Sequence, residues 1–85
     1  MIARDKPGHL ETRKANREAH LAYADDTGCV ATAGPLLAES EDMCGSLIVL
    51  DLPDLDAARE WAANDPYAKA GLFQSVELIQ WKKVR

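Results

Sequence analysis

The sequence predicts a small α+β domain of the ferredoxin-like type, formed by one unit that spans residues 1–85. Two observations carry this prediction. Two segments have helical composition or spacing, and four short segments suited to β-strands surround them in the order β-α-β-β-α-β. A single antiparallel sheet with both helices on one face would bury these two helices economically.

The first strand and the first helix are separated by a turn signal. Met1–Arg4 is suited to a short strand, and the proline and glycine of Asp5–Gly8 favour a turn. The helix is predicted over Leu10–Thr27, because this segment lacks glycine and proline and Gly28 suits the left-handed residue that ends many helices. Its apolar residues form two stripes, so both sides are expected to be partly covered, and the small alanines permit close packing on a sheet. One stripe comprises Ala15, Ala19 and Ala22, and the other comprises Leu10, Leu21 and Ala24.

The middle of the chain predicts two strands. Cys29–Ala33 is expected to form a strand that stops at Gly34 and Pro35, since this pair usually ends a strand and turns the chain. Leu36–Met43 is acidic and is expected to be a loop. Ser46–Leu50 is a continuous apolar run, too short for a typical helix, and predicts a strand that is covered on both faces.

A second helix and a last strand complete the order. The helix is expected to start after Pro53 with Asp54 as its N-cap, and to end at Asn64–Pro66 because proline disfavours helical geometry in the residue before it. A short helical turn is expected within Tyr67–Phe73, and Val76–Trp81 predicts the last strand. The sheet face without helices would stay apolar unless another subunit covered it, so we expect a homodimer or a higher oligomer.

Composition argues against several classes of protein. The chain carries 14 acidic and 10 basic residues, for a formal net charge of −4, which gives no electrostatic footprint for nucleic acid. No apolar run approaches the roughly 20 residues of a membrane span, and the first residues lack the layout of a secretion signal. We therefore expect a cytoplasmic protein. Its cysteines, Cys29 and Cys44, lie too far apart for a redox pair and have no zinc-ligand spacing, so no metal is expected.

The residues that suggest chemistry are few. His20 lies in the first helix, where a neutral imidazole can accept or donate a proton near neutral pH once a carboxylate orients it. Asp65, held beside a proline at the end of the second helix, is the best candidate for that carboxylate. Taken alone, one histidine and one distant aspartate are more often structural. Tyr67 suits either a ligand contact or the rim of the domain, and the Ser46 hydroxyl is placed to face a pocket.

Several segments together resemble the YciI-like, or YCII-related, family. These segments are Ala3–Gly8, Arg17–Leu21, Thr32–Leu36, Gly45–Ser46 and Ala63–Tyr67. Each is weak alone, but their order and spacing are specific and the similarity runs nearly end to end. The resemblance implies a dimeric ferredoxin-like α/β barrel. The family's chains usually carry several more apolar residues before the first of these segments, so the first strand is expected to be cut short.

The resemblance also implies a site. His20 and Asp65 match the family's catalytic pair, and Ser46, Gly34 and Pro35 match residues near its pocket. One relative is a dehydrochlorinase that acts on a chlorinated hydroxyhydroquinone, and the fold is similar to that of muconolactone isomerase. These chemistries move protons on small rings and need no cofactor.

The resulting expectation is a cofactor-independent lyase or isomerase that acts on a small molecule. Arg17 or Tyr67 would steady an anionic or phenolic substrate in this enzyme. Two alternatives stay open. The same pocket can hold a metabolite in a non-catalytic binding module, or the pair of His20 and Asp65 can simply tie the two helices together.

Overall fold

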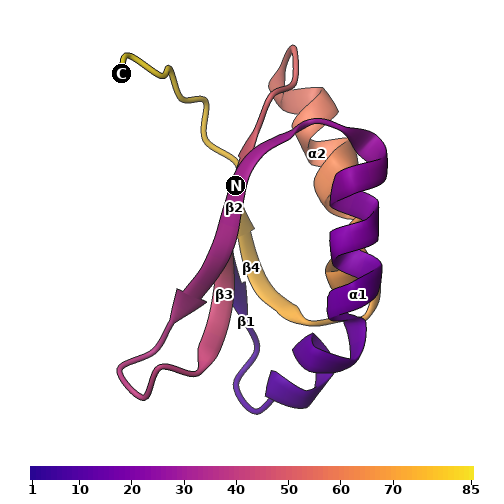
Figure 1. Ribbon diagram of the computed structural model, residues 1–85, viewed down its shortest axis with the longest axis vertical. Coiled ribbons are helices and arrows are strands. Elements are labelled where there is room, and N and C mark those ends of the chain that lie inside the picture. The colour runs from indigo at the N-terminus through magenta and orange to yellow at the C-terminus, as the bar shows by residue number, and fades with distance from the viewer.

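Four strands form one antiparallel sheet in the spatial order β2-β3-β1-β4, in a computed structural model that describes residues 1–85. The elements are β1 (Ile2–Asp5), α1 (Leu10–Thr27), β2 (Val30–Leu37), β3 (Met43–Leu50), α2 (Leu55–Ala63), α3 (Pro66–Lys69) and β4 (Phe73–Glu77). The helices lie against one face of the sheet and leave the other face bare (Figure 1). The predicted ferredoxin-like architecture is confirmed, with α3 as the short turn expected after the second helix.

Helix α1 has the predicted bounds but not the predicted buried face. Gly28 ends it with a φ of 65°, which a glycine adopts without steric cost. The stripe of Ala15, Ala19 and Ala22 is exposed, so the expectation that both stripes are partly covered was wrong for this one, whereas Leu10 and Ala24 of the second stripe are half-buried. The face turned inward is instead polar and aromatic, and it comprises Arg13, Asn16, His20 and Tyr23. The buried side of this helix therefore supplies functional groups as well as packing.

Strand β2 continues through the residues that were predicted to stop it. Gly34 pairs with Leu47 and Pro35 pairs with Ser46, and the strand ends only at Leu37. This is possible because β2 lies at the edge of the sheet, where the N–H that proline lacks is not needed by a second neighbour. The predicted loop over Leu36–Met43 shrinks accordingly, and β3 begins at Met43, three residues before the predicted start.

The last strand lies earlier in the chain than predicted. Its ladder with β1 runs from Phe73 opposite Asp5 to Glu77 opposite Ile2, and β1 offers no further residue beyond that point. Residues 78–81, which were predicted to be strand, therefore follow β4 without strand pairing. The register of the central strand, and not the apolar pattern, decides where the edge strand stops.

Strand β1 is short and central, as expected from the resemblance, and it approaches β3 closely. A side chain at Gly45 would collide with the carbonyl oxygen of Ala3 and lie 2.9 Å from Cδ1 of Leu36. Glycine is thus required at this position for the two central strands to pair.

The second helix begins and ends as predicted. The Asp54 carboxylate accepts a hydrogen bond from the Ala57 N–H at 2.8 Å, which makes Asp54 its N-cap, and Asn64 is the C-cap. Trp61 of α2 is buried, packs against Tyr23 of α1 and donates from its indole nitrogen to the Thr27 hydroxyl. No helix combines the length and apolar character needed to cross a bilayer.

Candidate active site

Asp65 is held at the junction of α2 and α3 by a capping hydrogen bond. It is the N-cap of α3, with Pro66 at the first helical position, and its Oδ1 accepts the Tyr67 N–H at 2.9 Å. The residue is fully buried. Because the cap restricts the rotamer, the local Asp-Pro-Tyr sequence aims the carboxylate into the space between the helices and the sheet.

His20 meets this carboxylate. Its Nδ1 lies 2.8 Å from Asp65 Oδ1, so that oxygen receives both the imidazole and the Tyr67 amide. An ionised carboxylate only accepts hydrogen bonds, which means that Nδ1 donates and a neutral imidazole presents an unprotonated Nε2. Nε2 makes no hydrogen bond and is not sealed from solvent, whereas Asp65 Oδ2 is buried without a partner. One end of the pair is therefore fixed and the other can reach a ligand.

Tyr67 stacks on the imidazole. The two ring centroids are 4.0 Å apart and the planes are 13° from parallel. Burial raises the pKa of Tyr67, and the positive charges of Arg13 and Arg17 only partly oppose this increase. The phenol therefore stays protonated at neutral pH. A protonated phenol can donate a hydrogen bond, and the Tyr67 side chain is almost fully buried, with 2% of the residue's surface exposed.

A second buried polar cluster adjoins the first, and sequence reasoning missed two of its members. Arg13 donates to both carboxylate oxygens of Asp5, at 2.6 and 3.0 Å, and to the Ser46 hydroxyl at 2.8 Å. Its guanidinium carbon lies 4.6 Å from the centroid of the Tyr67 ring. Burial alone would lower the pKa of Arg13, but the hydrogen bond and charge of Asp5 outweigh it, so the pKa is raised and the group stays charged. The seven-residue spacing between Arg13 and His20 was the available signal, since it places both on one helix face.

The remaining predicted residues are placed differently. Ser46 is buried beside Arg13, which donates to its hydroxyl, and it lines neither of the two hollows described below. Arg17 is exposed and makes no hydrogen bond, but its charge acts on the Tyr67 phenol. Gly34 and Pro35 lie on the exposed edge strand and make no hydrogen bond to the pair. Gly34 pairs with the partly exposed Leu47, which puts it on the sheet face that lacks helices.

The arrangement is suited to proton transfer. An imidazole oriented by a buried carboxylate is a general base whose protonated form the carboxylate stabilises. No three side chains of His, Cys, Asp or Glu come together as a set of metal ligands. The groups that can contact a ligand are instead Nε2 of His20, the Tyr67 hydroxyl and the guanidinium of Arg17.

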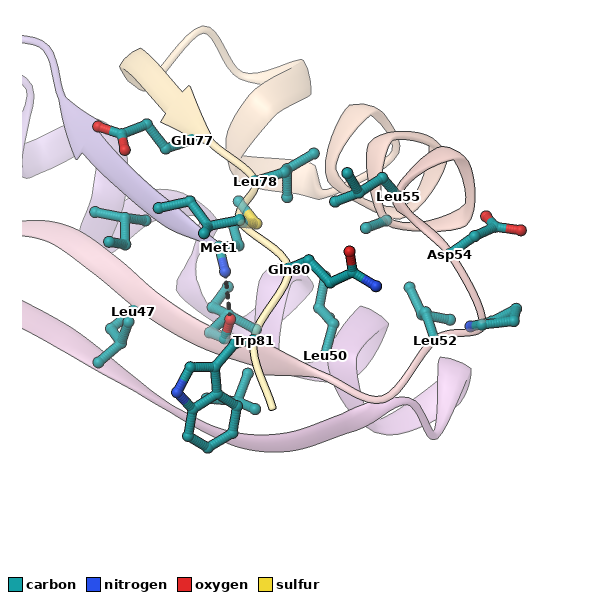
Figure 2. Close-up of a pocket in the computed structure, with 16 residues that line it drawn as sticks. Met1, Leu47, Leu50, Leu52, Asp54, Leu55, Glu77, Leu78, Gln80 and Trp81 are labelled. Carbon is teal, nitrogen blue, oxygen red and sulfur yellow. Dashed lines mark hydrogen bonds between the residues drawn. The ribbon is translucent and has the colours of Figure 1, made fainter. Parts of the chain in front are cut away.

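A well-formed hollow of the protein lies away from the pair of His20 and Asp65. It has a volume of about 480 Å³ and is mostly apolar, and neither His20 nor Asp65 lines it. Figure 2 shows its labelled residues on β3, at the start of α2 and in the chain that follows β4. We call this hollow the apolar groove. A shallower hollow of about 620 Å³ near Tyr23 and Pro66 also leaves out the pair. Size alone would direct attention away from the residues that can perform acid-base chemistry.

The chain is similar to proteins of one family along its whole length. Residues 1–82 match the YCII-related domain. Over 93 aligned residues, the chain is 40% identical to Protein YciI of Escherichia coli O6:H1, covering 99% of this chain and 95% of that protein. It is 37% identical to an uncharacterized protein of Haemophilus influenzae, with the same coverage.

A solved structure gives the same result. The fold is similar to that of 5-chloro-2-hydroxyhydroquinone dehydrochlorinase from Burkholderia phenoliruptrix, solved in complex with 2,5-dihydroxybenzoquinone. The TM-score is 0.84 and the identity 33%, and the match covers 96% of this chain and 94% of the dehydrochlorinase. The family match, the relatives at full coverage and the common fold agree that this chain belongs to the YCII-related family.

Proposed function

We propose that this protein is a cofactor-independent lyase or isomerase of small hydroxylated ring compounds, in which His20 and Asp65 transfer a proton. The observation that carries the proposal is the 2.8 Å contact between His20 Nδ1 and the fully buried Asp65 carboxylate, combined with an Nε2 that solvent reaches. The similarity to a dehydrochlorinase of such a compound supports the same reaction class.

The imidazole supplies the base. In a dehydrochlorination, His20 Nε2 takes a proton from the substrate, the electron pair left behind forms the new double bond, and chloride leaves. The resulting imidazolium is stabilised by the charge of the buried Asp65 carboxylate, whose Oδ2 has no hydrogen-bond partner. In an isomerisation, the same imidazolium would return its proton to a different atom of the ring.

Two further groups suit a phenolic or anionic substrate. The Tyr67 hydroxyl stays protonated and can donate to a substrate oxygen. The exposed Arg17 guanidinium, on the same helix as His20, adds a positive charge beside that hydroxyl. Together they favour a ring that carries partly ionised hydroxyl groups.

The proposal includes a homodimer or higher oligomer formed through the bare face of the sheet. Leu47 on that face keeps 47% of its surface exposed, although it lies on a strand that pairs on both sides. A second copy would cover this face, on which Gly34 also lies. Analytical ultracentrifugation of the protein and of Leu47→Asp tests the interface, since the charged variant should sediment as a monomer.

The function is tested by assaying chloride release from 5-chloro-2-hydroxyhydroquinone. His20→Asn is the informative variant, because its amide can still donate to Asp65 while Nε2 is lost. We expect this variant to lose about 10²- to 10⁴-fold in kcat. His9→Asn, which changes the only other histidine, is the matched control and should keep the activity.

Two results would overturn the proposal. Undiminished turnover in His20→Asn would remove this residue from the mechanism. Tight binding of 2,5-dihydroxybenzoquinone without turnover, across lyase and isomerase assays with related hydroxylated rings, would reassign the protein as a small-molecule-binding module.

A further inference from the structure

The ring of Tyr67 is inserted between two side chains of α1. The His20 ring centroid lies 4.0 Å from its centroid, and the Arg13 guanidinium carbon lies 4.6 Å from it. Two planar groups at these distances cannot share one face of the ring without overlapping, so they lie on opposite faces. Arg13 and His20 are seven residues apart, or about 10.5 Å along the helix axis, which leaves room for one ring between them.

The guanidinium is itself fixed from the side of the sheet. It donates two parallel hydrogen bonds to Asp5 of β1 and a third bond to Ser46 of β3. Such a bidentate pair fixes the plane of the guanidinium as well as its position. Arg13 keeps only 3% of its side chain exposed and Asp5 5%, so water does not compete for these bonds.

On the side of the stack opposite Arg13, Tyr67 and His20 both bind the Asp65 carboxylate. Tyr67 donates its backbone N–H to Asp65 Oδ1, the oxygen that also receives His20 Nδ1. A shift of the Tyr67 ring would therefore move both the surface on which the imidazole rests and the partner to which it is bonded. Arg13 is the only group that supports the ring from the other face with a cation–π contact.

We propose that Arg13 is a positioning residue that orients the His20 imidazole through the ring of Tyr67. The inference rests on the proposed function, in which His20 is the base. Arg13 acts without contacting the substrate. A lysine at position 13 keeps the charge but has neither the planar face nor the paired N–H groups, so it does not replace arginine.

The test compares Arg13→Lys with Arg59→Lys. Arg59 forms an ion pair with Asp56 at the same 2.6 Å distance but on the surface, which makes it a matched control. For Arg13→Lys we expect kcat for 5-chloro-2-hydroxyhydroquinone to fall about 10- to 100-fold, because misplacing a catalytic group by about 1 Å costs this much. KM should change by less than about threefold, because Arg13 does not contact the substrate and its loss leaves substrate binding in the ground state intact. Arg59→Lys should match the natural protein in both kcat and KM.

A substrate-independent measurement separates this inference from the proposed function. The His20 Nδ1–H proton, held by a buried carboxylate, should give a resolved signal in ¹H–¹⁵N spectra that broadens in Arg13→Lys and stays sharp in Arg59→Lys. A loss of this signal supports positioning even if no turnover is found. Conversely, if turnover survives in His20→Asn, the proposed function fails while the signal still reports on Arg13.

The outcome that overturns the inference is an Arg13→Lys protein with unchanged kcat and an unchanged Nδ1–H signal. If this variant does not fold, Tyr67→Leu and Tyr67→Phe carry the same test. The phenylalanine keeps the ring and should keep the signal, whereas the leucine should lose it. A sharp signal in Tyr67→Leu would equally reject the stacked ring as the link.

Discussion

The two ends of the space between sheet and helices are filled in opposite ways. At one end, Arg13, Tyr67 and His20 stack on one another and are tied to buried carboxylates. At the other end, the apolar groove stays open between β3 and the unpaired residues 78–81 (Figure 2). The polar end is made of buried side chains and carries the groups that can move a proton. In this protein, the apolar groove and the reactive groups lie in different places.

The difference also concerns what holds each end. The polar end depends on a few directional bonds with buried partners, so single substitutions there should have large effects. At the end around the apolar groove, the chain after β4 contributes exposed apolar side chains, and Ile79 and Trp81 keep 60% and 64% of their surface in solvent. Substitutions of these exposed residues should be tolerated.

The largest effect on stability is expected from Arg13→Met. Removing this guanidinium leaves the buried Asp5 carboxylate without a partner, which should cost about 3–5 kcal/mol of unfolding free energy. Arg59→Met, which breaks an equally short pair with 62% and 90% of its two side chains exposed, should cost at most about 1 kcal/mol. Urea unfolding measures both changes in unfolding free energy. Equal losses in the two variants would show that burial does not distinguish the Arg13–Asp5 pair from the Arg59–Asp56 pair.

The next effect is expected at the pairing of the central strands. Gly45→Ala forces its new methyl group against the Ala3 carbonyl, and overpacking of this kind costs about 1–3 kcal/mol. Gly34→Ala, on the neighbouring strand, has open space around the new methyl group and a φ that alanine tolerates, so its unfolding free energy should barely change. A Gly45→Ala protein as stable as Gly34→Ala would contradict the close approach of β1 to β3.

A smaller effect is expected from alkaline pH. Burial raises the pKa values of Tyr67 and Tyr23 above their ordinary value of 10.0, so the folded state holds these protons longer than the unfolded state. Their contribution to stability is therefore complete below pH 10.0 and declines as the pH rises through the folded-state values. Thermal unfolding at a series of pH values checks this direction.

The positive charge of Arg17 gives a second test of the raised pKa of Tyr67. Because the positive charge of Arg17 lowers the pKa of Tyr67, Arg17→Met should raise it further. The tyrosinate absorbance in a Tyr23→Phe background isolates Tyr67. A midpoint that stays in place or falls in Arg17→Met would show that this guanidinium does not act on the phenol.

The smallest effect is expected at the other end, for Trp81→Ala. This side chain lies after β4 and is mostly exposed, so its loss should change the unfolding free energy by about 0.5 kcal/mol or less. The buried Trp61 is the reference tryptophan, and its replacement by alanine should cost about 3–5 kcal/mol. A large loss of unfolding free energy in Trp81→Ala, measured at low protein concentration, would mean that the apolar groove stabilises the fold more than its exposure suggests.

Element order and helix ends were predictable because local chemistry decides them. Gly28 and Asp54 end and begin helices through their own backbone or side chain, and no distant partner is involved. The ends of β2 and β4 were not predictable in this way. They depend on which strand lies at the edge and where β1 pairs, and only the assembled sheet determines this.

The candidate site was predictable in part. Sequence analysis proposed Asp65 as the carboxylate partner of His20, and the structure brings the two to hydrogen-bonding distance. Arg13 and Asp5 were missed because a charged residue ordinarily points to solvent, and their burial arises only when β1 packs beside α1. The alanine stripe misled for the same reason, since apolar periodicity does not find a buried face made of polar residues.

The most direct test of which end carries the function is an NMR titration with 2,5-dihydroxybenzoquinone. We predict that this compound shifts the His20 Nε2 signal and the Tyr67 amide, and that residues of the apolar groove such as Leu52 and Leu78 stay unchanged. Shifts confined to Leu52, Leu78 and their neighbours, with none at His20, would contradict the assignment of the chemistry to the pair of His20 and Asp65.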